Sequence, residues 1–124
     1  MENQKLSKLA DSPIRWIADD ALKFVKREER RGVKYDGIIM DPPKFGRGPK
    51  GEVWQFEDDI PELLDSCAPI LTDSPLFFLL TAYTVPVSPI SLGNITSQIL
   101  SEGGIEYGEL SIQDAHGKLL PTSI

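Results

Sequence analysis

The 124-residue sequence predicts an α/β fold with a mostly parallel sheet. Apolar runs at residues 14–17, 37–40 and 75–82 have the length of strands, and segments with helical spacing of apolar residues separate them. Acidic residues close the first two runs. Because ligands bind beyond the carboxyl ends of the strands in such sheets, we expect these acids to lie on one functional rim.

The first half of the chain contains three predicted helices. Residues 2–9 have the character of the end of a helix, and a second helix begins at Ala21 and stops before Gly32. A third is predicted over residues 60–71, behind two acidic residues and with Pro61 in its first turn. Cys67 falls on its apolar stripe, so we interpret this cysteine as a core residue and not as a nucleophile.

The strands differ in their expected environments. Residues 37–40 lack polar alternation, which predicts a strand buried on both faces, and residues 75–82 are the most apolar run and the expected central strand. A last helix should begin at Ser88 and stop at the glycines 103–104. Residues 105–112 alternate as a half-exposed strand does, and residues 119–124 begin one more strand.

Composition indicates one globular domain with 40% apolar and 26% charged residues. The sequence has no apolar run long enough for a membrane span and no secretion signal, so we expect a cytoplasmic protein. With one cysteine and one histidine, we expect no internal disulfide and no metal site. The formal charge of −6 argues against a surface that binds nucleic acid as a whole. We interpret the basic residues between positions 23 and 34 as a solvated helix face.

The tripeptide Asp41-Pro42-Pro43 follows the strand at residues 37–40. Each proline fixes its own φ, lacks an N–H and restricts the residue before it, so this strand end is stiff and extended. It offers the Asp41 carboxylate, the Asp41 carbonyl and the Pro42 carbonyl as acceptors. A complementary ligand carries N–H donors, as the amino group or a ring N–H of a nucleobase does. Hydrogen bonds to these acceptors would hold the ligand in line with an electrophile, which is catalysis by proximity.

The next residues suggest a substrate loop. Phe45 is placed to stack on a planar ring, with a core position as the alternative. Lys44, Arg47 and Lys50 would meet flanking phosphates, unless they belong to a merely solvated loop. Residues 46–51 match G-x-G-x-x-G, but they neither follow a strand directly nor open a helix, so we interpret them as a mobile glycine-rich loop and not as a dinucleotide fingerprint.

Residues 14–54, with DPPKFGRG as their most specific part, resemble the middle of class I S-adenosylmethionine-dependent methyltransferases, especially the bacterial ribosomal RNA large-subunit methyltransferase-like group. The resemblance implies a Rossmann-like, three-layer α/β/α sheet and S-adenosylmethionine as cofactor. It also implies that Asp20 accepts a hydrogen bond from the adenine amino group, with Asp19 and Ala21 beside it, although Asp20 could equally be a plain helix N-cap. Residues 41–43 would lie between the cofactor's methyl group and a nucleobase of RNA.

The sequence departs from this family in two ways. Members that methylate carbon 5 of cytosine need a cysteine, and residues 81–84 supply none, which leaves transfer to nitrogen or to an unknown acceptor. The family's first strand, glycine-rich loop and ribose-binding acid precede its Asp-Pro-Pro strand, and nothing before Ile14 resembles them. We therefore expect residues 1–124 to be the C-terminal portion of a single catalytic domain that lacks its first two strands.

This expectation leaves the strand at residues 37–40 with an open edge. Residues 14–17 could pair with it, the edge could recruit a complementing N-terminal half or a second copy, or the fold could be marginal. Two alternatives to an active enzyme stay open. The chain could be an inactive remnant or interaction module that does not bind the cofactor alone, or another nucleotide-binding protein that uses residues 46–51 for phosphates.

Overall fold

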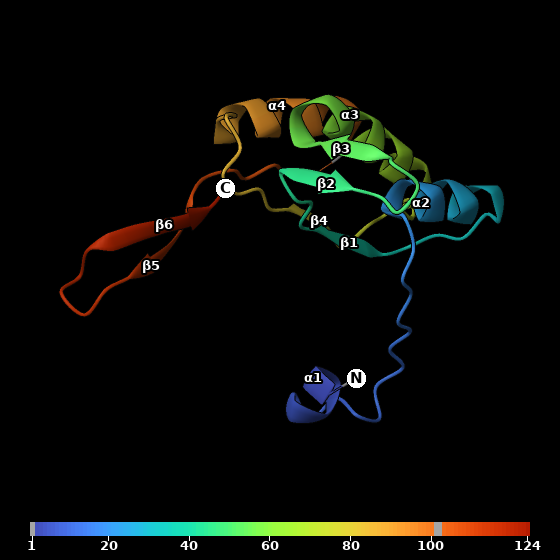
Figure 1. Cartoon of the computed structure of the whole chain (residues 1–124), viewed down its shortest axis with the longest axis horizontal. Helices are drawn as coiled ribbons and strands as arrows, with labels where there is room; N and C mark the ends of the chain where they lie inside the picture. Colours follow the sequence, from blue (N-terminus) through green and yellow to red (C-terminus); the bar gives the residue numbers. More distant parts are fainter. Residues whose placement is uncertain (1, 101–102) are drawn as a thin grey trace.

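The computed structural model describes residues 2–100 and 103–124 (Figure 1). The helices are α1 (Glu2–Leu6), α2 (Ala21–Arg30), α3 (Phe56–Cys67) and α4 (Pro89–Ile99), with a short 3₁₀ turn, η1 (Ala68–Ile70). The strands are β1 (Gly37–Met40), β2 (Phe45–Arg47), β3 (Val53–Gln55), β4 (Phe77–Leu80), β5 (Leu110–Gln113) and β6 (Leu119–Ser123). The α/β class predicted from the sequence is confirmed.

The centre of the molecule is the parallel pair β1 and β4, with Gly37 opposite Phe77 and Met40 opposite Leu80. In Figure 1 the helices α2, α3 and α4 lie on one side of this pair, and α1 lies apart on the other side. None of the residues of α1 is buried. The described body is therefore a layer of helices over a short sheet, and a full three-layer arrangement remains a prediction.

Helix α3 supplies most of the core. Phe56 and Leu64 on α3 are fully buried in one cluster with Ala82 and Leu92, and Cys67 lies in a second cluster with other residues of α2, α3 and η1. The inward side chains of the sheet pack against both clusters; they are Ile38, Met40, Phe78 and Leu80. The core position predicted for Cys67 is confirmed.

The outer face of the sheet is uncovered. Ile39 is 70% exposed, and Phe77 and Leu79 on the same face are about half exposed. Phe77 folds over Gly37, where a Cβ atom would lie only 2.8 Å from its ring. The prediction that residues 37–40 are buried on both faces is wrong, because β1 has a strand neighbour on one side only and helices on one face only.

The predicted strand at residues 14–17 does not form. The segment is extended and leads from α1 to α2 without a paired strand (Figure 1), and Ile14, Trp16 and Ile17 are exposed. A strand needs a neighbour for its backbone groups, and here the neighbour is missing. We call residues 2–18 the N-terminal arm; the Gln4 side chain orders it by accepting from Trp16 Nε1 at 3.2 Å and donating to the Leu9 carbonyl at 2.9 Å.

Two of the three longer helices begin at a side-chain N-cap. Asp20 and Ser88 cap α2 and α4 as predicted. Helix α3 begins at Phe56, one turn earlier than predicted, so Pro61 lies inside it and not in its first turn. Asp59 permits the early start, since its Oδ2 accepts from the Gln55 backbone N–H at 2.6 Å. Helix α4 ends at Ile99; residues 101–102, next to the predicted glycine stop, lie outside the described residues.

Two antiparallel hairpins complete the fold. The expected mobile loop is instead the hairpin β2–β3, which we call the basic hairpin (residues 44–55). Its turn closes with a Gly48 N–H to Glu52 carbonyl bond of 2.9 Å, and Gly51 has the positive φ of 87° that such a turn favours. The second hairpin, β5–β6, uses only residues 110–113 of the strand expected from 105 to 112, because residues 105–109 run as an irregular segment and place Tyr107 on Gly93 of α4. No helix in the described part of the chain is long and apolar enough to cross a membrane.

Candidate functional site

Asp41 and Thr81 meet at the carboxyl ends of β1 and β4. The two strands are parallel and Met40 pairs with Leu80, so the next residue of each strand reaches the same rim. The Thr81 hydroxyl donates to Asp41 Oδ1 at 2.6 Å, and the Thr81 N–H donates to the Met40 carbonyl at 2.9 Å. These bonds fix the Asp41 carboxylate in place while its Oδ2 receives no hydrogen bond from the described residues.

The two prolines behave differently. Pro42 is buried, and its carbonyl accepts no hydrogen bond from the described part of the chain. The Pro43 carbonyl accepts from Trp54 Nε1 at 2.6 Å, which ties the Asp-Pro-Pro segment to β3. Asp41 Oδ2 and the Pro42 carbonyl therefore accept no hydrogen bond from the described residues; their role as ligand acceptors stays a prediction.

Phe45 lies on the surface of the basic hairpin. Its side chain is 52% exposed, so the alternative of a core position is wrong. The Arg47 guanidinium lies 5.8 Å from the centroid of the Phe45 ring, within the range of a cation–π contact. An aromatic ring beside a cation at an exposed position can stack with a base that is not paired in a duplex.

The basic hairpin carries three cations that are free of ion pairs with described residues. Lys44, Arg47 and Lys50 form no ion pair with any described carboxylate. By contrast, most cations of α2 and its end are paired, in Lys23–Glu52, Lys26–Glu62, Arg27–Asp19 and Arg31–Glu28. The basic residues of α2 thus stabilise the fold, and those of the hairpin remain available to a ligand.

The predicted cofactor residues lie at the start of α2. Asp20 is the N-cap: its Oδ1 accepts from the Lys23 N–H at 2.9 Å, and no described residue donates to its Oδ2. Asp19 is already bound, because Arg27 lies 2.7 Å from its Oδ2 and the Asp20 N–H donates to its Oδ1. Both bonds, that from Arg27 first, lower the pKa of Asp19. Ala21 is exposed at the first position of the helix.

One contact brings the start of α2 next to the basic hairpin. Lys23 Nζ lies 3.4 Å from Glu52 Oε1, and the Glu52 side chain also accepts from the Lys50 N–H at 2.9 Å. Hydrogen bonds from the backbone N–H groups of Glu52 and Lys50 are the main causes that lower the pKa of Glu52, and the Lys23 side chain lowers it further. The start of α2, which carries the predicted cofactor residues, and the turn of the basic hairpin, which carries Lys50, are thereby neighbours in space.

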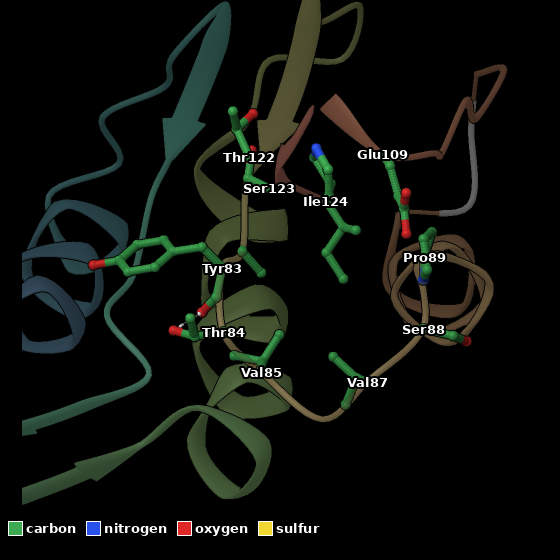
Figure 2. A pocket seen from close by; sticks show the side chains of 12 residues that line it. Tyr83, Thr84, Val85, Val87, Ser88, Pro89, Glu109, Thr122, Ser123 and Ile124 are labelled. Atoms are coloured by element: carbon green, nitrogen blue, oxygen red, sulfur yellow. Dashed lines mark hydrogen bonds between the residues drawn. The ribbon is translucent and has the colours of Figure 1, made fainter. Parts of the chain in front are cut away.

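A cavity of about 410 Å³ opens beyond the end of β4. Figure 2 shows Tyr83, Thr84 and Val85 along one side and Ile124 across from them. Thr84 has a φ of 55°, unusual for a β-branched residue, and its hydroxyl donates to the Tyr83 carbonyl at 2.7 Å. Neither Asp41 nor Asp20 lines this cavity, so the predicted site lies outside this hollow; both carboxylates belong to exposed residues, whereas Pro42 is buried.

Sequence reasoning places the segment 81–84 at the strand ends beside Asp41, but it missed the role of Thr81 and the parts played by Trp54 and Glu52. Thr81 orients Asp41, Trp54 holds Pro43, and Glu52 joins α2 to the hairpin. The parallel register alone would have found Thr81, because it follows β4 as Asp41 follows β1. Trp54 and Glu52 depend on the β2–β3 pairing, which a segment rich in glycine and proline does not indicate.

The rim of Asp41 and Thr81 lies at the carboxyl ends of two parallel strands in an α/β domain, and comparison with known proteins shows which class this domain resembles. No family profile matches the chain. The SAM-dependent methyltransferase from Agrobacterium tumefaciens is similar in structure over 98% of this chain, with a TM-score of 0.91 and 46% identity. A putative methyltransferase, SMU.776, complexed with SAH, is similar over 90% with a TM-score of 0.68 and 21% identity, which shows the fold alone.

Curated relatives match about a third of the chain. The ribosomal RNA large subunit methyltransferase I of Escherichia coli O1:K1 is 43% identical over 44 residues, which is 36% of this chain. The protein of the same name from Shigella boydii serotype 18 matches equally. These comparisons confirm the resemblance to class I S-adenosylmethionine-dependent methyltransferases. The chain spans 42% of the Agrobacterium protein and the match covers 11% of the Escherichia coli one.

Proposed function

We propose that this chain contributes to methyl transfer from S-adenosylmethionine to a nucleobase in RNA, and that the nucleobase belongs to ribosomal RNA. The observation that carries the proposal is the pair of free acceptors, Asp41 Oδ2 and the Pro42 carbonyl, on a strand end that Thr81 and Trp54 hold rigid. The 46% identity with a SAM-dependent methyltransferase over almost the whole chain supports it.

On this proposal the rim positions the acceptor nitrogen. Asp41 Oδ2 and the Pro42 carbonyl accept from its N–H groups, which aligns the nitrogen and keeps it electron-rich. S-adenosylmethionine supplies an electrophilic methyl group when bound. Asp41 Oδ2 then takes up the proton that the nitrogen loses. Cys67 has no part in this reaction, because it is buried and burial raises the pKa of its thiol to about 11.

The residues at the start of α2 fit the cofactor in part. Asp20 Oδ2 is a free acceptor that would hold the adenine amino group, while Oδ1 keeps its capping bond, so both predicted roles are compatible. Ala21 presents no bulk beside it. Asp19 fits less well, since Arg27 occupies its carboxylate. We therefore assign Asp20 and Ala21 to the cofactor and Asp19 to orienting the turn.

The basic hairpin is the proposed contact to RNA. Phe45 stacks on a base next to the acceptor, and Lys44, Arg47 and Lys50 contact the phosphates. More than half of the Agrobacterium protein has no counterpart in this chain. We therefore propose that full activity belongs to an assembly that includes such a part, in this polypeptide or in a complementing one, and that this chain alone binds the cofactor weakly.

Isothermal titration with S-adenosylhomocysteine tests the cofactor site. Wild-type protein is expected to release heat on binding, and Asp20→Ala is expected to release none. Asp20→Ser removes the carboxylate but keeps a side chain that can cap the helix, so it should also release no heat. If Asp20→Ser bound as wild type does, the carboxylate would be only a cap. If wild-type protein released no heat at millimolar ligand, the chain would be an inactive remnant or interaction module.

A second experiment tests the acceptor site. In an assembly that methylates RNA, Asp41→Asn is expected to lower kcat by on the order of 10²-fold with little change in KM for the cofactor, because it places a donor where an acceptor is needed. Lys26→Gln is the matched control, since Lys26 lies on α2 in an exposed ion pair with Glu62. Equal activity of Asp41→Asn and wild type would remove Asp41 from the mechanism.

A further inference from the structure

Tyr83 is an exposed aromatic residue just beyond β4 that the proposed function does not use. Its side chain is 44% exposed, and its hydroxyl forms no hydrogen bond with the described residues. A tyrosine ring offers two apolar faces and a polar tip, a combination that suits contact with a planar polar ligand. The direction in which this ring points decides whether it belongs to the rim of Asp41.

The backbone at Ala82 fixes the side of the sheet on which Tyr83 lies. The Ala82 N–H donates to the Ile124 carbonyl at 2.6 Å and the Ile124 N–H donates to the Ala82 carbonyl at 2.8 Å, a reciprocal pair that holds Ala82 extended. The Ala82 side chain is fully buried in one cluster with Phe56 of α3. Since side chains alternate along an extended backbone, Tyr83 faces away from that core. Figure 2 shows its ring directed away from Val87 and Ile124.

Asp41 lies on the same side of the sheet as Tyr83. Met40 and Leu80, the last residues of β1 and β4, pack against the core. Asp41 and Thr81, which follow them, therefore face the opposite side, where the bond of 2.6 Å joins them. Tyr83 comes two positions after Thr81. Diagonal neighbours on one face of paired strands lie roughly 7–8 Å apart, within reach of an aromatic side chain. A planar ligand held by Asp41 thus comes within reach of the Tyr83 ring.

Thr84 holds Tyr83 in this direction. The φ of 55° at Thr84 is unfavourable for a β-branched residue, and the chain bends there directly after Tyr83. The Thr84 hydroxyl donates to the Tyr83 carbonyl at 2.7 Å, and the bonds of Ala82 fix the preceding residue. Strain of this kind persists only where the surrounding structure imposes it, and it gathers at sites that hold ligands. The strained residue thus adjoins an exposed aromatic ring on the side of Asp41.

We propose that Tyr83 stacks on the acceptor base itself and that the substrate is an unpaired nucleotide of RNA. This inference rests on the proposed function and adds to it a residue and a class of substrate. Asp41 Oδ2 and the Pro42 carbonyl bind the edge of the base, and Tyr83 covers one of its faces. Phe45 remains the contact for the neighbouring base. A base whose face and edge are both bound by protein has left its stack and its pair, as a base in a loop or single strand already has.

Substitutions at Tyr83 test the stacking in an assembly that methylates RNA. Tyr83→Leu keeps an apolar side chain but removes the aromatic face, so kcat/KM for RNA should fall about 10- to 100-fold. The KM for S-adenosylmethionine should not change. Tyr83→Phe keeps the ring and should resemble wild type. Leu119→Ala, at an exposed position of β6, is the matched control and should also resemble wild type. Slow reaction of the buried Cys67 with a thiol reagent shows that each variant is folded.

The outcomes separate this inference from the proposed function. If Tyr83→Leu were as active as wild type while Asp41→Asn lost activity, the stacking would be wrong and the proposed function would stand. Equal losses in Tyr83→Leu and Tyr83→Phe would also overturn the stacking, because the ring is kept in Tyr83→Phe. A wild-type assembly that never methylates RNA would overturn the proposed function and this inference with it.

The pairing state of the RNA tests the class of substrate. A complementary oligonucleotide annealed over the methylated site is expected to slow methylation by wild-type protein about 10-fold or more, because the base must first leave its pair. The same oligonucleotide annealed elsewhere on the RNA is the control and should have no effect. Equal rates on the unpaired and the paired site would overturn the assignment of an unpaired nucleotide.

Discussion

Glu28 is the buried charged residue of the described core. Only 4% of its surface is exposed, and its carboxylate accepts from the Tyr35 hydroxyl at 2.8 Å and from Arg31 at 3.1 Å. Burial first, and then the bond to Glu28, raise the pKa of Tyr35. The sequence places Glu28 on a polar helix face, so its burial follows from the way α2 meets the segment before β1.

Removing the Glu28 carboxylate leaves the Tyr35 hydroxyl without its partner in a partly buried place. We expect Glu28→Ala to lower the free energy of unfolding by about 1–3 kcal/mol. Tyr35→Phe should recover part of this loss when combined with Glu28→Ala, because no hydroxyl is then left unpaired. Urea unfolding of the four proteins in the cycle measures the coupling, and strictly additive losses would show that the bond contributes nothing.

Cys67 is expected to be inert in the native protein. Burial raises the pKa of its thiol from 9.0 to about 11, so little thiolate exists at pH 8. In the unfolded chain the thiol has its ordinary pKa of 9.0, so its contribution to the free energy of unfolding is fully present below pH 9. This contribution is lost as the pH rises through 9 towards the folded pKa of about 11. Reaction with a chromogenic disulfide at pH 8 should be slow without urea and fast in it; the rate of a free thiol without urea would contradict the burial.

At the scale of elements, the basic hairpin is the part of the site that the sequence predicted least well. Glycine and proline between positions 46 and 51 indicate a loop, yet β2 and β3 pair in register from Phe45 opposite Gln55 to Arg47 opposite Val53. The pairing is possible because Glu52 closes the turn and Trp54 anchors β3 to Pro43. Residues close in sequence to Asp41 thereby become a rigid neighbour of the rim.

Three unpaired cations on this hairpin set the expected salt dependence of binding to single-stranded RNA. If each neutralises one phosphate, the logarithm of the affinity should fall with the logarithm of the salt concentration with a slope of about −2. Lys44→Gln or Lys50→Gln should each reduce the slope by about 0.7. Fluorescence anisotropy with a labelled oligonucleotide measures it, and Lys26→Gln, paired with Glu62 on α2, should leave it unchanged.

At the scale of the whole molecule, the body and the N-terminal arm are energetically separate. The arm buries no residue of α1, and its apolar side chains from Ile14 to Ile17 are exposed. Deleting residues 1–18 should therefore change the free energy of unfolding of the dilute, monomeric protein by no more than about 0.5 kcal/mol. Fluorescence of Trp54, the remaining tryptophan, follows the unfolding. A loss of several kcal/mol would show that the arm packs on its own body.

Much of the fold could be predicted because its signals are local. The Asp20 and Ser88 caps, the strand at 37–40 and the apolar stripe through Cys67 depend on residues within one or two turns of each other. The errors at residues 14–17 and at the outer face of β1 concern contacts between distant segments, whereas the error at Pro61 concerns only the residue at which α3 begins. A run such as IRWI has strand character in any context, but it forms a strand only where a neighbour exists.

By itself the sequence determined the stiff acceptor end of Asp41, Pro42 and Pro43, since proline geometry is a property of the residue. It also determined the N-cap at Asp20 and most helices and strands, but not the absence of a strand at residues 14–17 or the pairing of β2 with β3. Only the tertiary structure decided that Thr81 orients Asp41, that the hairpin cations are free while most of those of α2 are paired, and that β1 has a strand neighbour on one side only in the described residues. The physical reason is that hydrogen bonds and ion pairs between side chains, and the coverage of a strand edge, depend on segments that only folding brings together.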